Sequence, residues 1–190
     1  MDCIEALLGR RSCRSFLPDP VEEEKLKTVL ECAIYAPSPA NKQPWEFVVA
    51  RNPEYNRKLR ENAEAAKVYL AGRSGWKWVP SFRLDFVSEA PVLIAVAGDP
   101  SQSGLEQFAK EPSKGYPQAC AAAIENLCVA AHSMGLATLW FSMFDKDGAR
   151  EIFGISPEKD PVAIVCLGYP RQIGAAPRRW GLENKVRYLD

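Results

Sequence analysis

Apolar residues recur at helical intervals in several stretches of the chain, and this periodicity predicts helices. The predicted helices cover residues 2–9, 21–36, 54–71, 118–134 and 148–154. In the first helix Ile4, Leu7 and Leu8 share one face. Asp2 is placed to cap its start and Gly9 to stop it. The chain therefore begins with a short helix that ends where a cluster of arginines starts.

Other apolar stretches lack this period and predict strands. They cover residues 46–50, 90–99, 136–144 and 161–170. The stretch 90–99 is apolar without alternation, as in a strand buried on both faces. Residues 72–87 show no clean period and are interpreted as loop with some helix, and residues 100–117 as a long connection of the kind that covers a site.

Helices and strands alternate irregularly, which favours an α+β or a mixed three-layer α/β fold. The strand order does not follow from the pattern. The length of 190 residues favours one domain over 1–190, with two very small domains as the weaker alternative.

The composition of the chain limits which classes of binding partner we expect. The 24 basic and 24 acidic residues balance, which argues against nucleic acid or an anionic membrane as partner. The apolar runs are far below the ~18 residues of a membrane span, so we expect a cytoplasmic protein. Six cysteines without a C-x-x-C pair are expected to be reduced, buried thiols, and no metal site is expected.

Few side chains suit acid–base or nucleophilic catalysis. The single histidine, His132, falls near a predicted helix end, and the clustered acids at 22–24 suit a solvated helix start. We therefore predict no catalytic side chain and favour a cofactor that brings its own chemistry. Glycine patterns for phosphate binding are absent, so a bound phosphate would need side-chain cations such as Arg10, Arg11 and Arg14.

Four stretches of the sequence resemble the nitroreductase family of FMN-dependent oxidoreductases. They read RRSCRSF, APSPANKQPWEFVV, AAAIENLCVAAHSMGLATLWFSMFD and GYPRQIGAAPRRWGLENKV, in this order. The resemblance implies a nitroreductase-like three-layer α+β sandwich with a mixed, mostly antiparallel sheet flanked by helices. It also implies an intertwined homodimer that binds two FMN molecules at its interface, with each sheet completed by the partner's C-terminal extension.

The resemblance assigns the arginines to FMN. Arg10 and Ser12 would hold the phosphate and ribityl end, while Arg14 would reach the pyrimidine edge, where a fixed cation stabilises the negative charge of reduced flavin. Arg11 belongs to the same cofactor-binding cluster but alternates away from these positions and needs no direct contact. A second phosphate-binding cation would be Arg179, with Arg178 close behind.

Two further segments match the family's flavin contacts. Pro37, Ser38, Pro39 and Asn41 resemble a loop that one subunit lays against the flavin of the other, although an ordinary helix-to-strand turn is the alternative. Ser142 and Met143 lie where main-chain N–H groups address flavin N5 and O4. Many relatives have glycine there, and Met143 would narrow the space above the ring.

The implied activity has two half-reactions, in which NADH or NADPH reduces FMN and a nitroaromatic, quinone or enone then takes the electrons. Candidates for an apolar acceptor pocket are Trp76, Trp78, Phe82 and Phe108, although core packing is the alternative for most of them. Other activities remain open, namely reductive dehalogenation, breakdown of the flavin, a flavin-binding redox carrier or sensor, and a ligand-free interaction module.

Overall fold

The structure is a computed structural model that describes residues 1–104 and 115–189. Its helices are α1 (Cys3–Gly9), α2 (Glu23–Ile34), α3 (Pro53–Ser74), α4 (Asp85–Glu89), α5 (Gly115–Ser133) and α6 (Lys146–Phe153). Its strands are β1 (Trp45–Ala50), β2 (Val92–Gly98), β3 (Ala137–Phe141) and β4 (Asp160–Gly168). Short 3₁₀ turns cover Pro39–Asn41, Pro100–Gln102 and Leu182–Asn184.

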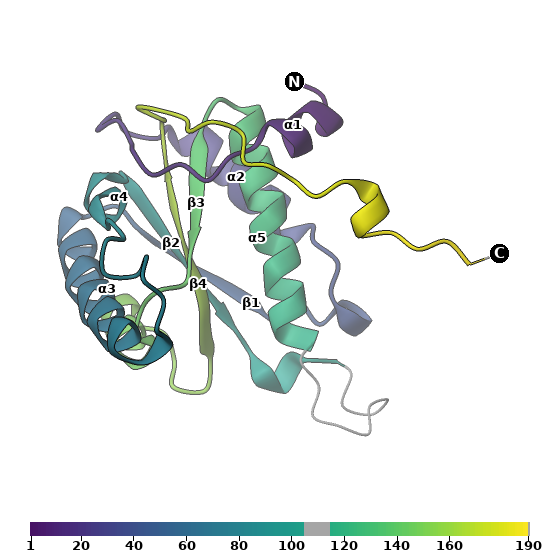
Figure 1. Cartoon of the computed structure of the whole chain (residues 1–190). Coiled ribbons are helices and arrows are strands. Elements are labelled where there is room, and N and C mark those ends of the chain that lie inside the picture. Colours follow the sequence, from purple (N-terminus) through teal and green to yellow (C-terminus); the bar gives the residue numbers. More distant parts are fainter. Residues whose placement is uncertain (105–114, 190) are drawn as a thin grey trace.

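The strands form one sheet in the order β1-β2-β4-β3, and each neighbouring pair is antiparallel. A parallel contact occurs outside these strands, where Ser12 bridges to Thr138 on β3. Helices lie on both sides of the sheet, with α2 and α5 on one side and α3 and α4 on the other (Figure 1). The structure confirms the α+β prediction.

Strand β2 shows why the sheet needs helices on both faces. All of its residues are buried. Val92, Ile94 and Val96 pack with residues of α2 and α5, whereas the alternate residues Leu93 and Ala95 pack with residues of α3, α4 and α6. Burial of each valine, leucine or isoleucine side chain contributes roughly 1.5–3 kcal/mol. The predicted two-faced burial is therefore confirmed, and β2 lies between the two core clusters.

Helix α1 begins as the sequence predicts. Asp2 Oδ1 accepts a hydrogen bond from the main-chain N–H of Glu5 at 2.8 Å, and Glu5 Oε2 accepts one from that of Asp2 at 3.0 Å. The apolar face, in contrast, is not buried, because Ile4 is 63% and Leu8 73% exposed. This face therefore has the composition of an interior but lies on the surface of the single chain.

Most element boundaries differ from the predicted ones by one to three residues, and two of the differences affect the surroundings of the site. Helix α3 continues to Ser74 and ends at Gly75, whose positive φ of 66° is the left-handed conformation that glycine adopts freely. Strand β3 ends at Phe141, so residues 142–144 of the predicted strand form a loop. The second difference exposes Ser142 at the sheet's end.

Candidate functional site

The arginine-rich segment that follows α1 is held on both sides. The main-chain N–H of Cys13 donates to Thr138 O on β3 at 2.9 Å. That of Leu17 donates to Tyr169 O at 2.9 Å, and that of Arg171 donates to Ser15 O at 3.0 Å. The segment therefore runs beside the chain that leaves β4, as Figure 1 shows at the top of the molecule. These bonds fix the backbone that carries Arg10 to Arg14.

Arg10 is only partly neutralised. Its Nε lies 3.3 Å from Glu125 Oε1 on α5, and its side chain is 23% exposed. This Nε is buried but makes no hydrogen bond to a described residue, so the proximity is an ion pair without good donor geometry. The guanidinium group thus retains donors for an anion.

Arg11 holds the end of α1 together. Its Nη1 donates to Leu8 O at 2.7 Å and to Arg10 O at 2.8 Å. His132, near the end of α5, lies against Gly9, where a Cβ atom would come within 2.8 Å of the imidazole Nε2. Burial lowers the pKa of His132, and the charges of Arg10 and Arg11 lower it further. The structure thus places His132 in helix packing, as the sequence suggested.

Arg14 opens into a hollow of about 520 Å³, called here the Arg14 hollow. Its lining consists of Arg14, Ser15, Trp78, Ser81, Phe82, Arg83, Asp85, Phe86, Glu89 and Gln172. The Arg14 side chain is exposed and donates to no other residue in the described part of the chain. Ser12, two residues earlier, is also exposed.

Ser142 and Met143 border a second hollow of about 650 Å³, called here the Met143 hollow, together with Tyr69 and Leu70 of α3. The main-chain N–H of Met143 donates to no described residue. A row of rings connects the two hollows. Centroid distances are 6.1 Å from Phe82 to Phe86, 5.3 Å from Phe86 to Phe141 and 6.1 Å from Phe141 to Phe144.

The turn after α2 has an unusual backbone. Ala40, Asn41 and Gln43 have φ values of 49°, 54° and 49°, in the left-handed region that residues other than glycine rarely adopt. Ser38 Oγ accepts from the main-chain N–H of Gln43 at 3.0 Å, and Asn41 Oδ1 accepts from Gln43 Nε2 at 3.3 Å. Such conformations cost about 1–3 kcal/mol each and cluster at functional sites.

Within one chain this turn and the arginines are far apart. Pro39 packs at the start of α5, where a Cβ atom on Gly115 would lie 3.2 Å from its ring. Arg10 contacts Glu125 instead, ten residues further along the same helix, which corresponds to about 15 Å. The single chain therefore does not unite these two predicted parts of the site.

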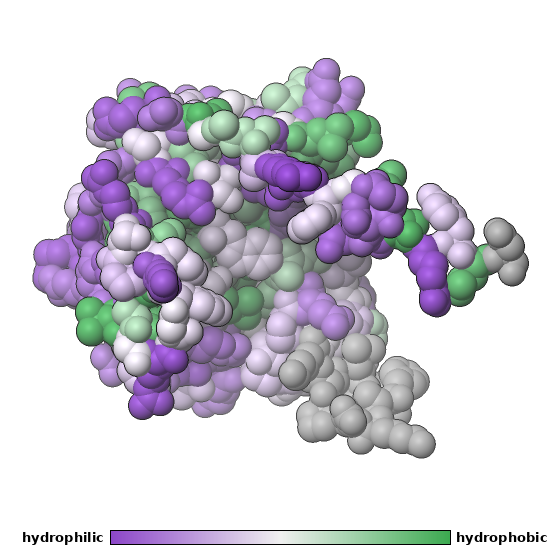
Figure 2. Space-filling model, in the orientation of Figure 1, coloured by the Kyte–Doolittle hydropathy of each residue, from purple (hydrophilic) through white to green (hydrophobic). Residues whose placement is uncertain are grey.

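Arg178 and Arg179 lie in a different environment from Arg10, because they are exposed on the C-terminal segment. All described residues from 171 onward are exposed, and the segment leaves the body as an extended arm (Figure 1). Figure 2 shows hydrophobic patches along this arm between hydrophilic ones. Its large exposed apolar residues include Ile173, Trp180, Leu182, Tyr188 and Leu189. An arm of this composition has apolar surface that its own chain does not cover.

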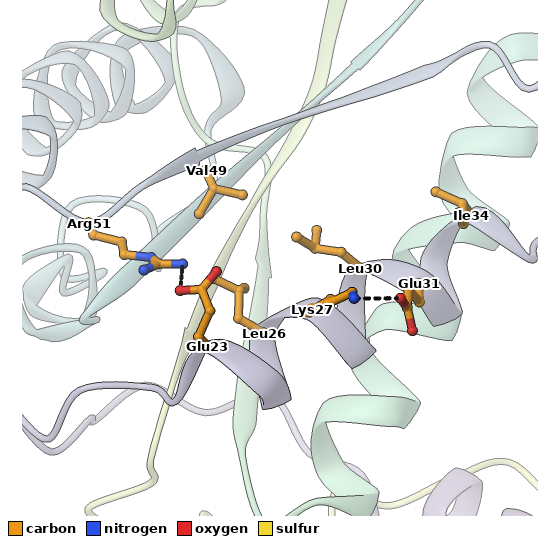
Figure 3. A pocket seen from close by; sticks show the side chains of 8 residues that line it. All are labelled: Glu23, Leu26, Lys27, Leu30, Glu31, Ile34, Val49 and Arg51. Atoms are coloured by element: carbon orange, nitrogen blue, oxygen red, sulfur yellow. Dashed lines mark ion pairs between the residues drawn. The ribbon is translucent and has the colours of Figure 1, made fainter.

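The outer edge of β1 borders a groove of about 490 Å³ against α2. Leu30, Ile34 and Val49 contribute apolar side chains to this groove (Figure 3). Two ion pairs flank it, Arg51 with Glu23 at 2.6 Å and Lys27 with Glu31 at 3.8 Å. We call it the β1 groove.

Residues 7–169 match the model of the Nitroreductase family. The chain belongs to the nitroreductase family. It is 30% identical over 213 residues to a protein of Thermus thermophilus named NADH dehydrogenase, covering 98% of this chain and 95% of that protein. It is 32% identical over 180 residues to the 5,6-dimethylbenzimidazole synthase of Rhodospirillum rubrum, covering 90% and 83%.

A solved structure shares the fold. The protein from Exiguobacterium sibiricum, determined in complex with FMN, superposes with a TM-score of 0.82 at 20% identity, covering 100% of this chain and 98% of that one. The family membership inferred from the four sequence stretches is thus confirmed.

The predicted acceptor-pocket residues have different locations in this nitroreductase-family chain. Trp78 and Phe82 line the Arg14 hollow. Trp76 stacks on Trp78 with 5.8 Å between ring centroids. Phe108 lies outside the described residues. Trp45 packs against the core on the α2 and α5 side.

The cysteines follow the prediction in part. All six are free thiols, but Cys3 is exposed and Cys32 only half-buried, which corrects the expectation that all are buried. Burial raises the pKa of Cys120 to about 12 and that of Cys128 to about 11, so these thiols stay protonated and unreactive. In the described ranges, no helix is long and apolar enough to cross a membrane.

Sequence reasoning missed Glu125 as a contributor to the site region, and it offered Arg83 only as a substitute for an asparagine that some family members use at the pyrimidine edge. Glu125 lies 115 residues after Arg10, and Arg83 lies 69 residues after Arg14. No local pattern links members of either pair, because only the packing of α5 and of the chain before α4 brings them together. Neither residue carries a motif of its own.

Proposed function

We propose that this nitroreductase-family protein is an FMN-dependent oxidoreductase that takes electrons from NADH or NADPH and gives them to a nitroaromatic, quinone or enone acceptor. The observation that carries the proposal is the fixed segment 10–17, which presents Arg10 and Arg14 between β3 and the exit of β4. Relatives named NADH dehydrogenase and a neighbour solved with FMN support the same activity.

The residues present fit FMN. The Nε of Arg10 faces Glu125, but its Nη groups donate to no described residue, so they can meet a phosphate dianion. Arg14 has no polar partner among the described residues and lies at the Arg14 hollow. Beyond the end of β3, the main-chain N–H of Met143 donates to no described residue. Phosphate, pyrimidine edge and N5 would therefore each meet a suitable donor.

FMN, when bound, accepts a hydride at N5 and passes two electrons on. The protein's own residues would bind and orient the flavin. Arg10 and Ser12 would hold the phosphate end, and Arg179 would add a second cation, with Arg178 close behind. The guanidinium of Arg14 would stabilise negative charge at the pyrimidine edge, and the N–H of Met143 would direct the ring. No side chain needs to move a proton in the first half-reaction.

We also infer a homodimer, because one chain separates the parts of the site. The turn with Pro37, Ser38, Pro39 and Asn41 would reach the flavin of the other subunit. The C-terminal arm of each subunit would cover the partner's β1 groove, where an edge strand has unpaired main-chain groups. This arrangement would also bury the apolar residues of the arm and the exposed face of α1.

The overall reaction balances with simple co-reactants. NADH or NADPH and one proton supply the two electrons and two hydrogens that convert a quinone to its hydroquinone. The same two electrons and two protons convert a nitro group to a nitroso group and release water. An acceptor therefore needs no further reductant.

The visible spectrum of the purified protein tests the proposal, followed by anaerobic mixing with NADH or NADPH. We expect a yellow protein whose visible band bleaches rapidly on mixing. A yellow protein that stays inert would instead indicate a redox carrier. A colourless protein that does not take up added FMN would indicate an interaction module and would contradict the proposal.

A second candidate is breakdown of the flavin itself. It is favoured by the 32% identity to a protein named 5,6-dimethylbenzimidazole synthase. Incubation with FMN, NADH and oxygen, followed by chromatography, separates the candidates. The oxidoreductase returns intact FMN, whereas the alternative converts FMN to a dimethylbenzimidazole.

A further inference from the structure

The Arg14 hollow combines charged and aromatic residues that the proposed cofactor site does not all use. Arg14 and Ser15 come from the segment after α1, and Gln172 comes from the start of the C-terminal arm. The remaining lining comes from residues 78–89, which include α4. The volume of about 520 Å³ is in the range of sites for small molecules.

Both carboxylates of this hollow already have partners. Asp85 accepts from Arg83 Nε at 2.7 Å and from Arg60 Nη1 at 3.1 Å. The hydrogen bond from Arg83, and then that from Arg60, lowers the pKa of Asp85. Glu89 Oε2 accepts from the main-chain N–H of Phe16 at 2.9 Å. The acids are therefore matched by donors within the protein.

The arginines of the hollow, in contrast, have N–H groups without an acceptor among the described residues. Arg83 uses Nε for Asp85, and its Nη groups donate to no other residue of the described chain. Its side chain is 87% exposed. Two parallel N–H groups at the end of a guanidinium fit the two oxygens of a carboxylate. The Nη groups of Arg83 can therefore bind an anion that enters the hollow from solution.

The wall beside Arg83 is aromatic. Trp78 is 49% exposed, although it stacks on Trp76 and meets the ring of Phe82 edge-on with 5.6 Å between centroids. A planar ligand ring can pack against such a wall, and aromatic pairs contribute beyond simple burial of area. The guanidinium group and the indole ring therefore present complementary surfaces to one kind of molecule.

We propose that the Arg14 hollow selects an aromatic acceptor that carries a carboxylate, with Arg83 binding the carboxylate and Trp78 packing against the ring. The inference rests on the proposed function, because Arg14 is assigned there to the flavin and leaves Arg83 for the acceptor. It narrows the proposed acceptors, a nitroaromatic, quinone or enone, to aromatic compounds that carry a carboxylate.

The test compares two nitroaromatics of nearly equal shape, 4-nitrobenzoate and the neutral 4-nitrobenzamide. The FMN-loaded full-length protein is assayed by NADH oxidation with each. We expect kcat/KM for the benzoate to exceed that for the amide at least about fivefold, mainly through KM. In Arg83→Gln this ratio falls to about one, because the charge that distinguishes the two compounds is gone.

Lys58→Gln is the matched control, since it also removes one positive charge but from the exposed surface of α3. It should keep the wild-type ratio. Equal kcat/KM values for the two compounds in the wild type would overturn the inference. So would an Arg83→Gln variant that loses activity equally on both, because that indicates a structural role.

A second measurement separates this inference from the proposed function. The chain has five tryptophans, so the part of the fluorescence quenching by the two nitro compounds that is lost in Trp78→Phe reports binding near Trp78 without turnover. Tighter binding of the benzoate in a protein that never oxidises NADH would support the inference while contradicting the function. Rapid NADH oxidation with menadione but equal quenching by the two nitro compounds would support the function and contradict the inference.

Discussion

The two arginine clusters of this chain differ in how the fold holds them. Arg10 and Arg14 lie on a segment bonded to β3 on one side and to the chain after β4 on the other. Arg178 and Arg179 lie on an exposed arm. The first cluster is positioned before any ligand or partner arrives, whereas in the proposed dimer the second would be positioned by the partner. Cations fixed in advance bind an anion without the entropy cost of ordering a segment.

Deletion of the C-terminal arm should have the largest effect on FMN binding and on the oligomeric state. A chain that ends after Gln172 retains the bonds of Arg171 to Ser15 and Phe16. It should be monomeric and bind FMN at least about a hundredfold more weakly, because both the partner's turn and the second phosphate cation are lost. Light scattering after size exclusion and titration with FMN measure these effects. A truncated protein that remains a yellow dimer would contradict the inferred arrangement.

Removal of the fixed cations should have the next largest effect. In the double variant Arg10→Ala and Arg14→Ala we expect the FMN dissociation constant to rise about a hundredfold, because charge-assisted hydrogen bonds are lost. The circular dichroism spectrum should not change, since Glu125, the partner of Arg10, is 44% exposed and can be hydrated. Riboflavin, which lacks the phosphate, is the control ligand for the Arg10 contribution. Loss of the folded state would refute this prediction.

A single substitution in the arm measures how much its arginines contribute to FMN binding compared with Arg10 and Arg14. Arg179→Ala should weaken FMN binding only about tenfold, because a flexible cation contributes less than a fixed one. The effect should shrink at high salt, where exposed charges are screened. Arg178→Ala is the matched variant and should have the smaller effect. If the order of the two variants is reversed, Arg178 is the phosphate-binding cation.

The smallest expected effect concerns pH. The pKa of His132 is lowered in the folded protein by burial and by Arg10 and Arg11, so the folded state favours the neutral imidazole. The unfolded chain then binds more protons, and stability falls as the pH drops from about 7.5 to about 5.5. His132→Gln should lose less stability over this interval, as measured by urea unfolding with saturating FMN. An equal loss in both proteins would exclude His132 as the cause.

Local signals explain which parts of the fold could be predicted. The capping residue Asp2, the periodicity of α2 and the uninterrupted apolar run of β2 are each signals between neighbours in sequence. They gave correct elements with end points shifted by a few residues. The site could be predicted only as a set of residues. The four stretches that resemble the family indicate which residues belong to the site, but they do not show how these residues lie relative to one another.

Tertiary structure decided the rest. The apolar run of β2 resembles a parallel strand, yet β2 pairs antiparallel on both sides, because burial depends on the covering helices rather than on strand direction. Arg83 joins Arg14 and Glu125 joins Arg10 only through packing of distant segments. The sequence by itself determined most of the helices and strands and the two-faced burial of β2, and it supplied arginines as candidates for binding a phosphate. Strand order and the grouping of those cations depend on contacts between residues far apart in the chain, which no local pattern encodes.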